Sequence, residues 1–409
     1  MQSSKRDLWL IRLYYLVWLG GGGFLYPYIT LFYKQQGLSG TEMGLLGTVG
    51  WGVAMLVAPM WGRWADNVRS PRRLIQFGLI GSALLNALLG LQTAFVWMAV
   101  IIAITSIVSS ATDPLSNAQA LAITNNRKSG FGSVRVWGSI GWVLITPVCG
   151  WLLEKTGLFT MFGGFAAFNL LGALVLAFII TQPPATSSRR SFGEKADAQP
   201  TPAMGNIIRE IGRDRSMVGL AVALFIYWIV NNGPVQFESI YLKELHASTF
   251  VIGLVNTTSA VIEIGAMFWA DRLVRRHGAG RILGISMLVF AAAKLIVVLS
   301  PSIPAIFAMR ALNGVYYSMF VISSIAYAAE GSPSGQGSTV MALYFVTLQG
   351  LTQLIAGPIS GAIFDAIGAY WLFVIACGGG VVSWLVLRLT ERPSPPLNGQ
   401  ADSIAESKI

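Results

Sequence analysis

Charged side chains are scarce in this chain of 409 residues, since Asp, Glu, Lys and Arg together make up 11% of it. Soluble domains carry about 25% charged residues, so an ordinary soluble enzyme is excluded. A disordered chain is excluded as well, because 54% of the residues are hydrophobic. The only two cysteines, Cys149 and Cys377, lie in apolar runs and cannot form a disulfide framework.

Motifs of catalysis and cofactor use are also missing. The two histidines, His246 and His277, cannot supply a multi-histidine metal site, and the chain has neither an HExxH nor a GxxxxGK[ST] motif. We therefore expect no enzymatic activity, no cofactor and no bound metal. Glycine, by contrast, is abundant with 45 residues, which is typical of closely packed membrane helices.

Apolar runs long enough to cross a membrane account for most of the chain. A bilayer core of about 30 Å needs roughly 20 apolar residues per helix. The first run has no small-residue cleavage site, so we expect a retained helix and not a cleaved signal peptide. The sequence predicts an all-α integral membrane protein with twelve transmembrane helices, at 8–34, 41–62, 73–93, 95–123, 133–153, 157–181, 216–242, 249–270, 281–299, 303–329, 337–363 and 369–390.

The basic residues are distributed unevenly between the loops. With a cytoplasmic N-terminus, twenty-one of the 28 Lys and Arg residues fall in cytoplasmic segments and only three in outer loops. This asymmetry predicts that both termini are cytoplasmic and that the protein lies in the inner (plasma) membrane. It also explains the net charge of +10, so we expect lipid and no nucleic acid as a partner.

The polar segment 182–215 separates the spans into six and six. Its prolines, serines and mixed charges predict a cytoplasmic linker, with a short amphipathic helix near 203–213. The predicted domains are a six-helix bundle at 1–181 and another at 216–390, followed by a disordered cytoplasmic tail at 391–409.

The two halves repeat one another in three places. Each half carries a Lys-Ser-Gly pattern near its first outer loop, a Trp-Ala-Asp after its second span, and Pro-x-x-Gly-x-x-x-acid-x-x-Gly at the end of its fifth span. The matched positions are Lys34, Ser39 and Gly44 with Lys243, Ser248 and Gly253; Trp64 to Asp66 with Trp269 to Asp271; and Pro147, Gly150, Glu154 and Gly157 with Pro358, Gly361, Asp365 and Gly368. Two similar six-helix halves are typical of transporters that bind substrate between the halves near the midplane.

Two stretches resemble motifs of a known family. Gly62-Arg-Trp-Ala-Asp66 resembles the signature loop of the major facilitator superfamily, although Asn67 replaces its first basic residue. The stretch from Arg135 through Trp137 to Trp142 resembles the fifth-helix motif of the branch that holds the nucleoside–proton symporters, the phenylpropionate permeases and the lactose permease. The resemblance implies the major facilitator fold, with two pseudo-symmetric six-helix bundles, alternating access and proton-coupled import.

Three ionisable residues inside the spans are candidates for proton coupling, because a charge in hydrocarbon is costly and is usually functional. Glu263 lies mid-helix in the eighth span, where that branch often keeps an essential carboxylate. The segment from Arg310 to Tyr316 resembles the tenth helix of the lactose permease, but Tyr316 stands where that permease has its proton-carrying Glu. The predicted coupling residues are Glu263, Arg310 and Asp113. A structural ion pair is the alternative for Glu263, and a packing role at the helix bend of Pro114 is the alternative for Asp113.

Polar and aromatic residues inside the spans are candidates for substrate binding. The Arg135 guanidinium can grip a sugar or a carboxylate in a fixed fork, or it can extend to the membrane surface. Amides suit hydroxyl groups but also join helices to one another, and Gly233-Pro234 is expected to break the seventh span. The predicted substrate-binding residues are Arg135, Trp137, Trp142, Asn231, Asn232, Tyr227, Gln349, Gln353 and Trp18.

Acidic residues at equivalent places after the second and eighth spans predict a cytoplasmic gate. Asp66 and Asp271 each lie beside a basic loop, where a carboxylate can hold a neighbouring helix through charge-assisted hydrogen bonds. The predicted gate residues are Gly62, Asp66, Asp271 and Arg272.

We therefore expect a monomeric secondary transporter that moves a small polar organic solute, a sugar, nucleoside or aromatic acid, together with protons. One alternative is an exporter of drugs or metabolites by proton antiport, which would have a more apolar cavity. An alternative of another class is a transport-inactive membrane sensor or lipid-handling protein.

Overall fold

The computed structural model describes residues 5–65, 71–124, 130–180, 204–332 and 336–391 of the chain. The first half contains eight helices in these ranges. They are α1 (Lys5–Leu25), α2 (Ile29–Gln35), α3 (Gly40–Ala65), α4 (Pro71–Gly90), α5 (Phe95–Ser109), α6 (Thr112–Thr124), α7 (Gly132–Thr156) and α8 (Thr160–Ala177).

The described part of the second half is helical throughout as well. Its elements are α10 (Met204–Arg213), α11 (Arg215–Glu244), α12 (Thr249–His277), α13 (Ala279–Leu299), α14 (Ile303–Glu330), α15 (Gly337–Ala342), the π-helical η1 (Leu343–Leu348), α16 (Gln349–Ile367) and α17 (Ala369–Thr390). Within the described ranges, 12 segments are long and apolar enough to cross a membrane, which confirms the predicted number of spans.

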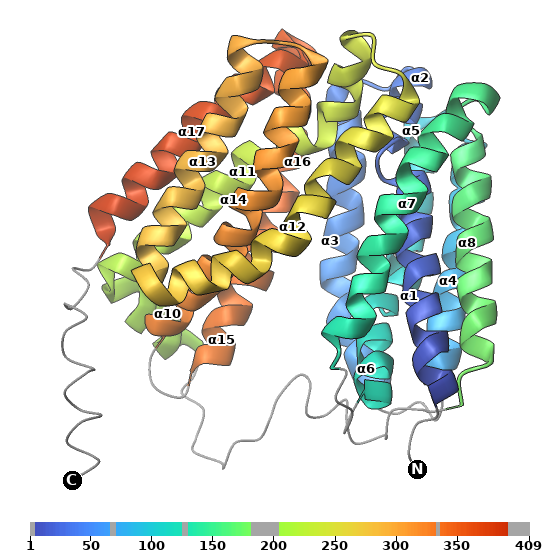
Figure 1. The fold of residues 1–409 in the computed structure, drawn as a ribbon, viewed down its shortest axis with the longest axis horizontal. Coiled ribbons are helices and arrows are strands. Elements are labelled where there is room, and N and C mark those ends of the chain that lie inside the picture. The colour runs from blue at the N-terminus through green and yellow to red at the C-terminus, as the bar shows by residue number, and fades with distance from the viewer. Residues whose placement is uncertain (1–4, 66–70, 125–129, 181–203, 333–335, 392–409) are drawn as a thin grey trace.

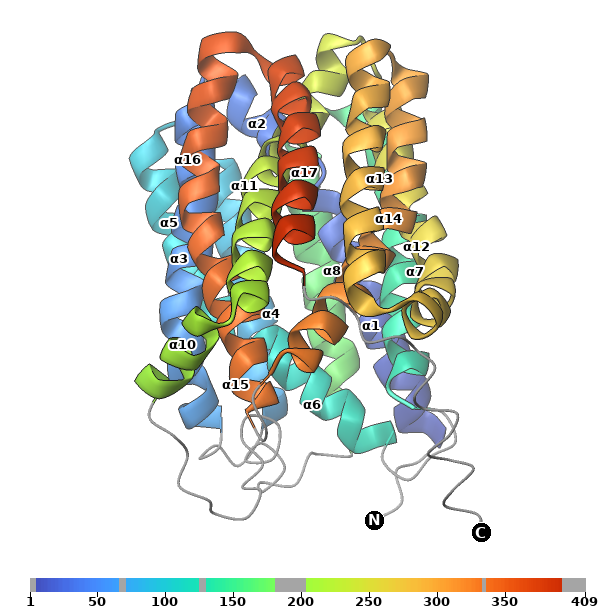
Figure 2. The ribbon, with the colours of Figure 1, turned by 90° about the vertical axis from the view of Figure 1, so that its left-hand side faces the viewer.

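The helices form two six-span bundles, one from each half of the chain (Figures 1 and 2). In the first, α1 packs on α7 and α8, and α4 packs on α5 and α8. In the second, α11 packs on α17, and α14 packs on α12 and α13. The bundles meet through α3 with α16 and α7 with α12. The start of α1 and the helices α6 and α15 lie at one end of the molecule, called here the terminal end, where the bundles diverge in Figure 1; the bundles converge at the opposite end.

Prolines interrupt some spans and leave others intact. The fourth span divides into α5 and α6 just before Pro114, and the first span divides into α1 and α2 around Pro27. The predicted break at Gly233-Pro234 is wrong, because α11 continues through both residues. A helix can tolerate a proline in a bundle where neighbouring elements enclose it, and Gly233 packs tightly against Leu372 of α17.

The repeated motif at the end of the fifth span of each half gives the same local structure twice. Gly157 follows α7 with φ 86°, and Gly368 follows α16 with φ 87°. Such a φ is strained for any residue with a Cβ. Both glycines therefore permit the sharp turn that starts the next helix at the opposite end, and the repeat predicted from the sequence is structural.

Close packing of α1 against α7 uses the glycines of the fifth-helix motif. A Cβ on Gly141 would overlap the carbonyl oxygen of Leu16, and a Cβ on Gly138 would overlap the side chain of Leu19. Small residues allow such backbone approach in membrane helices. This contact fixes the orientation of α7 and therefore the positions of Arg135 and Trp142 on it.

Hydrogen bonds between the bundles cluster toward the opposite end. Ser239 Oγ donates to the Pro27 carbonyl at 2.6 Å, and the Gln236 amide donates to the Met43 carbonyl at 2.9 Å. Thr257 Oγ1 donates to the Val143 carbonyl at 3.4 Å, and an ion pair joins Lys34 to Glu244 at 3.2 Å. The bundles are therefore closed against each other at this end.

The predicted short helix near 203–213 is present as α10, which packs on α11. Most of the predicted linker and nearly all of the predicted tail, 181–203 and 392–409, lie outside the described residues. The domain boundaries at 181, 215 and 390 remain predictions.

Candidate functional site

A cavity of about 310 Å³ lies between the two bundles. The first bundle contributes side chains of α1 and α7, and the second contributes those of α12 and α14. The lining residues are Leu19, Arg135, Gly138, Ser139, Trp142, Asn256, Ser259, Ala260, Glu263 and Arg310. The cavity begins directly on the terminal side of the Thr257–Val143 hydrogen bond, so it occupies the region where the bundles diverge.

Arg135 and Glu263 face the cavity from opposite bundles. Their charges lie close enough to interact, although they form no ion pair within 4 Å. Among the described residues, the Glu263 carboxylate accepts no hydrogen bond. Two opposite charges that share a cavity without contact leave room for a solute or a proton between them. These two predicted residues are therefore brought together, as a substrate or coupling site requires.

Arg310 behaves differently, because Glu238 of α11 neutralises it. Arg310 Nη2 lies 2.7 Å from Glu238 Oε1, and Arg310 Nε donates to Glu238 Oε2 at 3.0 Å. The two side chains are 12% and 3% exposed. A buried bidentate pair of this kind holds both groups in one geometry. Glu238 is thus the partner of Arg310, and Glu263 remains free for another role.

Lys294 lies behind the cavity and completes a charged cluster with this pair. Its side chain is 1% exposed and interacts electrostatically with both Glu238 and Arg310. Its ammonium group contacts Met309 Sδ at 3.7 Å and faces the rings of Phe290 and Phe373. A single carboxylate, Glu238, therefore balances two buried cations.

Asp113 belongs to a hydrogen-bond network between α1 and α6. Asn117 Nδ2 donates to Asp113 Oδ2 at 3.1 Å, and Tyr15 Oη donates to Asn117 Oδ1 at 2.8 Å. No ion pair joins Asp113 to Arg135 in the described residues, although both charges act on Tyr15. Asp113 lies near the predicted site without lining the cavity.

Of the predicted tryptophans, Trp142 lines the cavity, and it stacks on Tyr26 with a centroid distance of 6.4 Å. Trp137 instead packs edge-on against Trp9 at 5.8 Å. Trp18 stacks on Tyr14 at 5.6 Å. Trp142 is therefore the one of the three that presents an indole to the space between the bundles.

The predicted amides and Tyr227 are not among the residues that line this cavity. Asn232 Nδ2 donates to Gln353 Oε1 at 2.9 Å, which joins α11 to α16. Tyr227 is buried and stacks on Phe320 at 4.0 Å. Asn231 Oδ1 is buried and has no hydrogen-bond partner among the described residues. Gln349 begins α16 directly after the π-helical segment.

The predicted gate residues are only partly described. Asp66 lies outside the described residues, and for Gly62 only its place in α3 is described. Asp271 accepts hydrogen bonds from Arg275 one turn along its own helix, and the side chain of Arg272 is exposed. Among the described residues, Asp271 makes no hydrogen bond or ion pair to another helix in this conformation.

Four polar residues at or beside the cavity were not among the predicted site residues: Ser139, Asn256, Ser259 and Glu238. The Asn256 amide donates to the Ile252 carbonyl at 3.0 Å, while its own carbonyl oxygen accepts no hydrogen bond in the described residues. The spacing of Asn256 and Glu263, two helical turns apart in the eighth span, places them on one face of α12. That spacing could have indicated both Asn256 and the intervening Ser259.

Twelve spans in two bundles around a polar cavity define a membrane transporter of small solutes. The chain belongs to the MFS_1 like family, whose sequence model matches residues 8–375. This confirms the resemblance predicted from the signature loop and the fifth-helix motif. The relatives are transporters and not enzymes, also as predicted.

Individual relatives cover nearly the whole chain. The maltose permease of Geobacillus stearothermophilus is 27% identical over 93% of this chain and 94% of its own. A probable 3-phenylpropionic acid transporter of Escherichia coli (strain K12) is 24% identical over 92% of this chain and 95% of its own. The crystal structure of nucleoside transporter NupG superposes with a TM-score of 0.79 at 14% identity, and the match covers 95% of this chain and 99% of NupG. At this identity, the similarity to NupG shows a shared fold and nothing about the solute.

Proposed function

We propose that the protein imports a sugar together with protons by alternating access. The observation that carries this proposal is the cavity of about 310 Å³, to which each bundle contributes polar side chains. A site shared by two bundles can open to either side of the membrane as the bundles tilt against each other. The proposed symport needs both a solute site and a proton site, and the cavity offers candidates for each.

The charges around the cavity favour a neutral solute. Among the residues that line the cavity, Arg310 is neutralised by Glu238 and Arg135 faces Glu263. The further cation, Lys294, is buried outside the lining, so the lining itself offers no unbalanced cation to bind an anion. The Arg135 guanidinium, the Asn256 carbonyl and the Ser139 hydroxyl can exchange hydrogen bonds with sugar hydroxyls. The indole of Trp142 offers an apolar face for a sugar ring. The 27% identity to the maltose permease over almost the full length agrees with this solute class.

A nucleoside is the second candidate solute, because it combines sugar hydroxyls with a flat ring that could stack on Trp142. The fold similarity to NupG motivates its inclusion in any test. An aromatic acid is less well matched, since its carboxylate would have to compete with Glu263 for Arg135.

Glu263 is the proposed proton carrier. It is half-buried in the cavity, and among the described residues its carboxylate has no hydrogen-bond donor. Glu238, the other carboxylate of the second bundle's interior, is held by Arg310 and cannot exchange a proton without breaking a buried ion pair. A proton on Glu263 would weaken its attraction to Arg135, which couples protonation to the solute site.

The orientation follows from the basic residues. Cytoplasmic loops are enriched in Lys and Arg, so we place the terminal end at the cytoplasmic face of the plasma membrane. The conformation then corresponds to an inward-open state, with the bundles closed toward the outside. In such a state the gate hypothesis expects Asp271 to make no contact with another helix, and among the described residues its hydrogen bonds come from Arg275 of its own helix.

Uptake into proteoliposomes with an imposed inward proton gradient tests this proposal. Radiolabelled maltose, uridine and 3-phenylpropionate are offered separately, and wild-type protein is compared with empty vesicles. We expect maltose to accumulate above its external concentration, and dissipation of the gradient to abolish the accumulation. Preferential uptake of uridine or 3-phenylpropionate would replace the proposed solute class. Equal fluxes with and without protein, for all three solutes, would support the transport-inactive alternative.

A further inference from the structure

The two contacts between the bundles at the opposite end are copies of each other. A Cβ on Gly361 of α16 would overlap the carbonyl oxygen of Gly40, which begins α3. A Cβ on Gly150 of α7 would overlap the carbonyl oxygen of Thr249, which begins α12. Gly150 and Gly361 are matched positions of the internal repeat, and so are the starts of α3 and α12. Each bundle therefore packs a fifth-span glycine on the first residue of a helix in the other bundle.

At the first copy a carboxylate caps the helix. Asp365, one turn beyond Gly361, accepts a hydrogen bond from the Gly40 backbone N–H at Oδ1. Its Oδ2 accepts bonds from both the backbone N–H and the hydroxyl of Thr41, each at 2.8 Å. A carboxylate at this position satisfies free N–H groups and interacts favourably with the helix dipole.

At the second copy the corresponding place holds no carboxylate. Glu154, one turn beyond Gly150, is the counterpart of Asp365, yet it makes no hydrogen bond or ion pair in the described part of the chain. Thr249 is 5% exposed, and its Oγ1 is buried without a hydrogen-bond partner. An unsatisfied buried hydroxyl costs free energy, so this helix start lacks the acceptor that its copy has.

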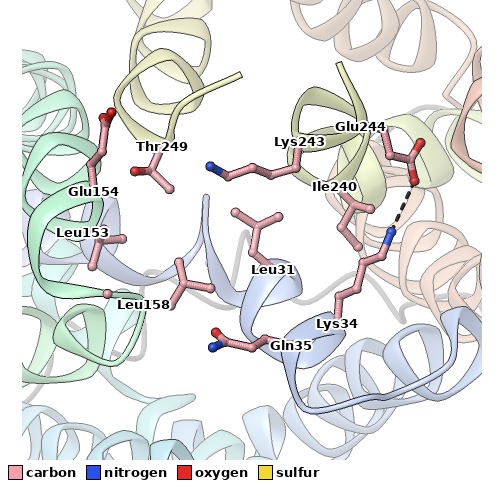
Figure 3. Close-up of a pocket in the computed structure, with 11 residues that line it drawn as sticks. Leu31, Lys34, Gln35, Leu153, Glu154, Leu158, Ile240, Lys243, Glu244 and Thr249 are labelled. Carbon is pink, nitrogen blue, oxygen red and sulfur yellow. Dashed lines mark hydrogen bonds and ion pairs between the residues drawn. The ribbon is translucent and has the colours of Figure 1, made fainter. Parts of the chain in front are cut away.

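A pocket of about 600 Å³ opens at this place, and both Glu154 and Thr249 line it (Figure 3). Lys34 and Glu244 close one side of the pocket with their ion pair. Lys243 extends its ammonium group into the space toward Thr249 in Figure 3 and has no ion-pair partner among the described residues. The pocket is thus lined by a cation and by Thr249, whose buried hydroxyl has no hydrogen-bond partner among the described residues. Thr249 also starts a helix of 29 residues.

We propose that the start of α12 is a carboxylate-binding site that opens into this pocket, with Thr249 Oγ1 as donor and Lys243 as counter-ion. Two sources can supply the carboxylate. Glu154 can turn onto the helix, which would complete the symmetry with Asp365 and tighten the closure between the bundles. A small carboxylate from solution can instead enter through the pocket.

Fluorine NMR of fluoroacetate with purified full-length protein tests the site directly. The linewidth of the fluoroacetate signal is compared for wild type, Glu154→Gln, Thr249→Val and the Glu154→Gln/Thr249→Val double variant. Lys155→Gln is the matched control, because Lys155 is the adjacent charged residue but packs on Trp151 and does not line the pocket. The measurement does not depend on transport, so its failure is separate from a failure of the proposed function.

Broadening that appears with Glu154→Gln but not with wild type would support the site and identify Glu154 as its usual occupant. Broadening with both proteins would support the site with a dissolved carboxylate as its ligand. In either case loss of the Thr249 hydroxyl should weaken fluoroacetate binding about tenfold, as expected for a hydrogen bond to a charged group. Absence of broadening in both proteins, or equal broadening in the absence of the Thr249 hydroxyl, would overturn the proposal.

Discussion

Replacement of Glu238 by Gln should be among the most destabilising changes available in the second bundle. Glu238 is 2% exposed and is the carboxylate that balances both Arg310 and Lys294. Removal of one partner of a buried ion pair costs about 3–5 kcal/mol, because a buried charge is left uncompensated. Two cations depend on Glu238, so we expect Glu238→Gln to lower the free energy of unfolding by at least that amount.

Lys294 provides a second test, because its replacement should change the free energy of unfolding in the opposite direction or hardly at all. In wild type its ammonium group is buried against Phe290, Phe373 and Met309, an environment that suits methionine. Lys294→Met removes a desolvated charge and leaves the neutral Glu238–Arg310 pair, so we expect it to change stability by less than about 1 kcal/mol or to increase it. Added to Glu238→Gln, it should raise stability by at least about 1 kcal/mol more than it does in the wild-type background, because neighbouring sites couple.

Unfolding in mixed micelles of increasing SDS fraction measures these free energies for purified protein. Glu330→Gln is the matched control, since Glu330 is exposed at the end of α14 and should stay within about 0.5 kcal/mol of wild type. The reasoning would be refuted by a Glu238→Gln protein as stable as the control. Additive effects of the Glu238 and Lys294 substitutions would refute the shared-counter-ion argument alone.

Three further outcomes follow from the contacts described above. Arg135→Lys keeps the charge but loses the planar fork, so the KM for solute should rise about tenfold or more; an unchanged KM would favour the surface-directed position of Arg135. Asp365→Asn weakens charge-assisted bonds between the bundles worth about 1.5–3 kcal/mol, so a cysteine placed at Thr48 should react faster with an impermeant maleimide added at the opposite end. Unchanged labelling would exclude a closing role for Asp365. Gly141→Val should sharply reduce the yield of folded protein because its side chain overlaps the Leu16 carbonyl, whereas Gly163→Val, with nothing within 4 Å of a Cβ, should not; equal yields would contradict the packing argument.

Elements whose signal is local could be predicted from the sequence. The number of spans follows from runs of apolar residues, and the break in the fourth span follows from Pro114. Local signals failed where packing decides the outcome. Pro234 lies inside a continuous helix, and Gly233 beside it allows Leu372 of α17 to approach closely. No sequence pattern indicated the π-helical segment before Gln349.

The candidate site could be predicted only in part, because local sequence signals identify its charged residues but not their partners. Glu263 and Arg135 stand out as charges in apolar runs, and the structure brings both to one cavity. The choice of Glu238 as the partner of Arg310 depends on the rotation of α11 relative to α14, which a single sequence does not encode at short range. Asn232 and Gln353 form a hydrogen bond between two helices that are distant in the chain. The sequence alone could not show whether these amides bond to each other or face a cavity.

Simultaneous measurement of solute and proton flux tests the central claim most directly. Proteoliposomes that contain a pH-sensitive dye receive an inward maltose gradient without an imposed proton gradient. We predict that the interior of wild-type vesicles acidifies as maltose enters, and that Glu263→Gln vesicles take up maltose downhill with no pH change. Maltose entry without acidification in wild type, or unchanged acidification in Glu263→Gln, would contradict proton symport through this cavity.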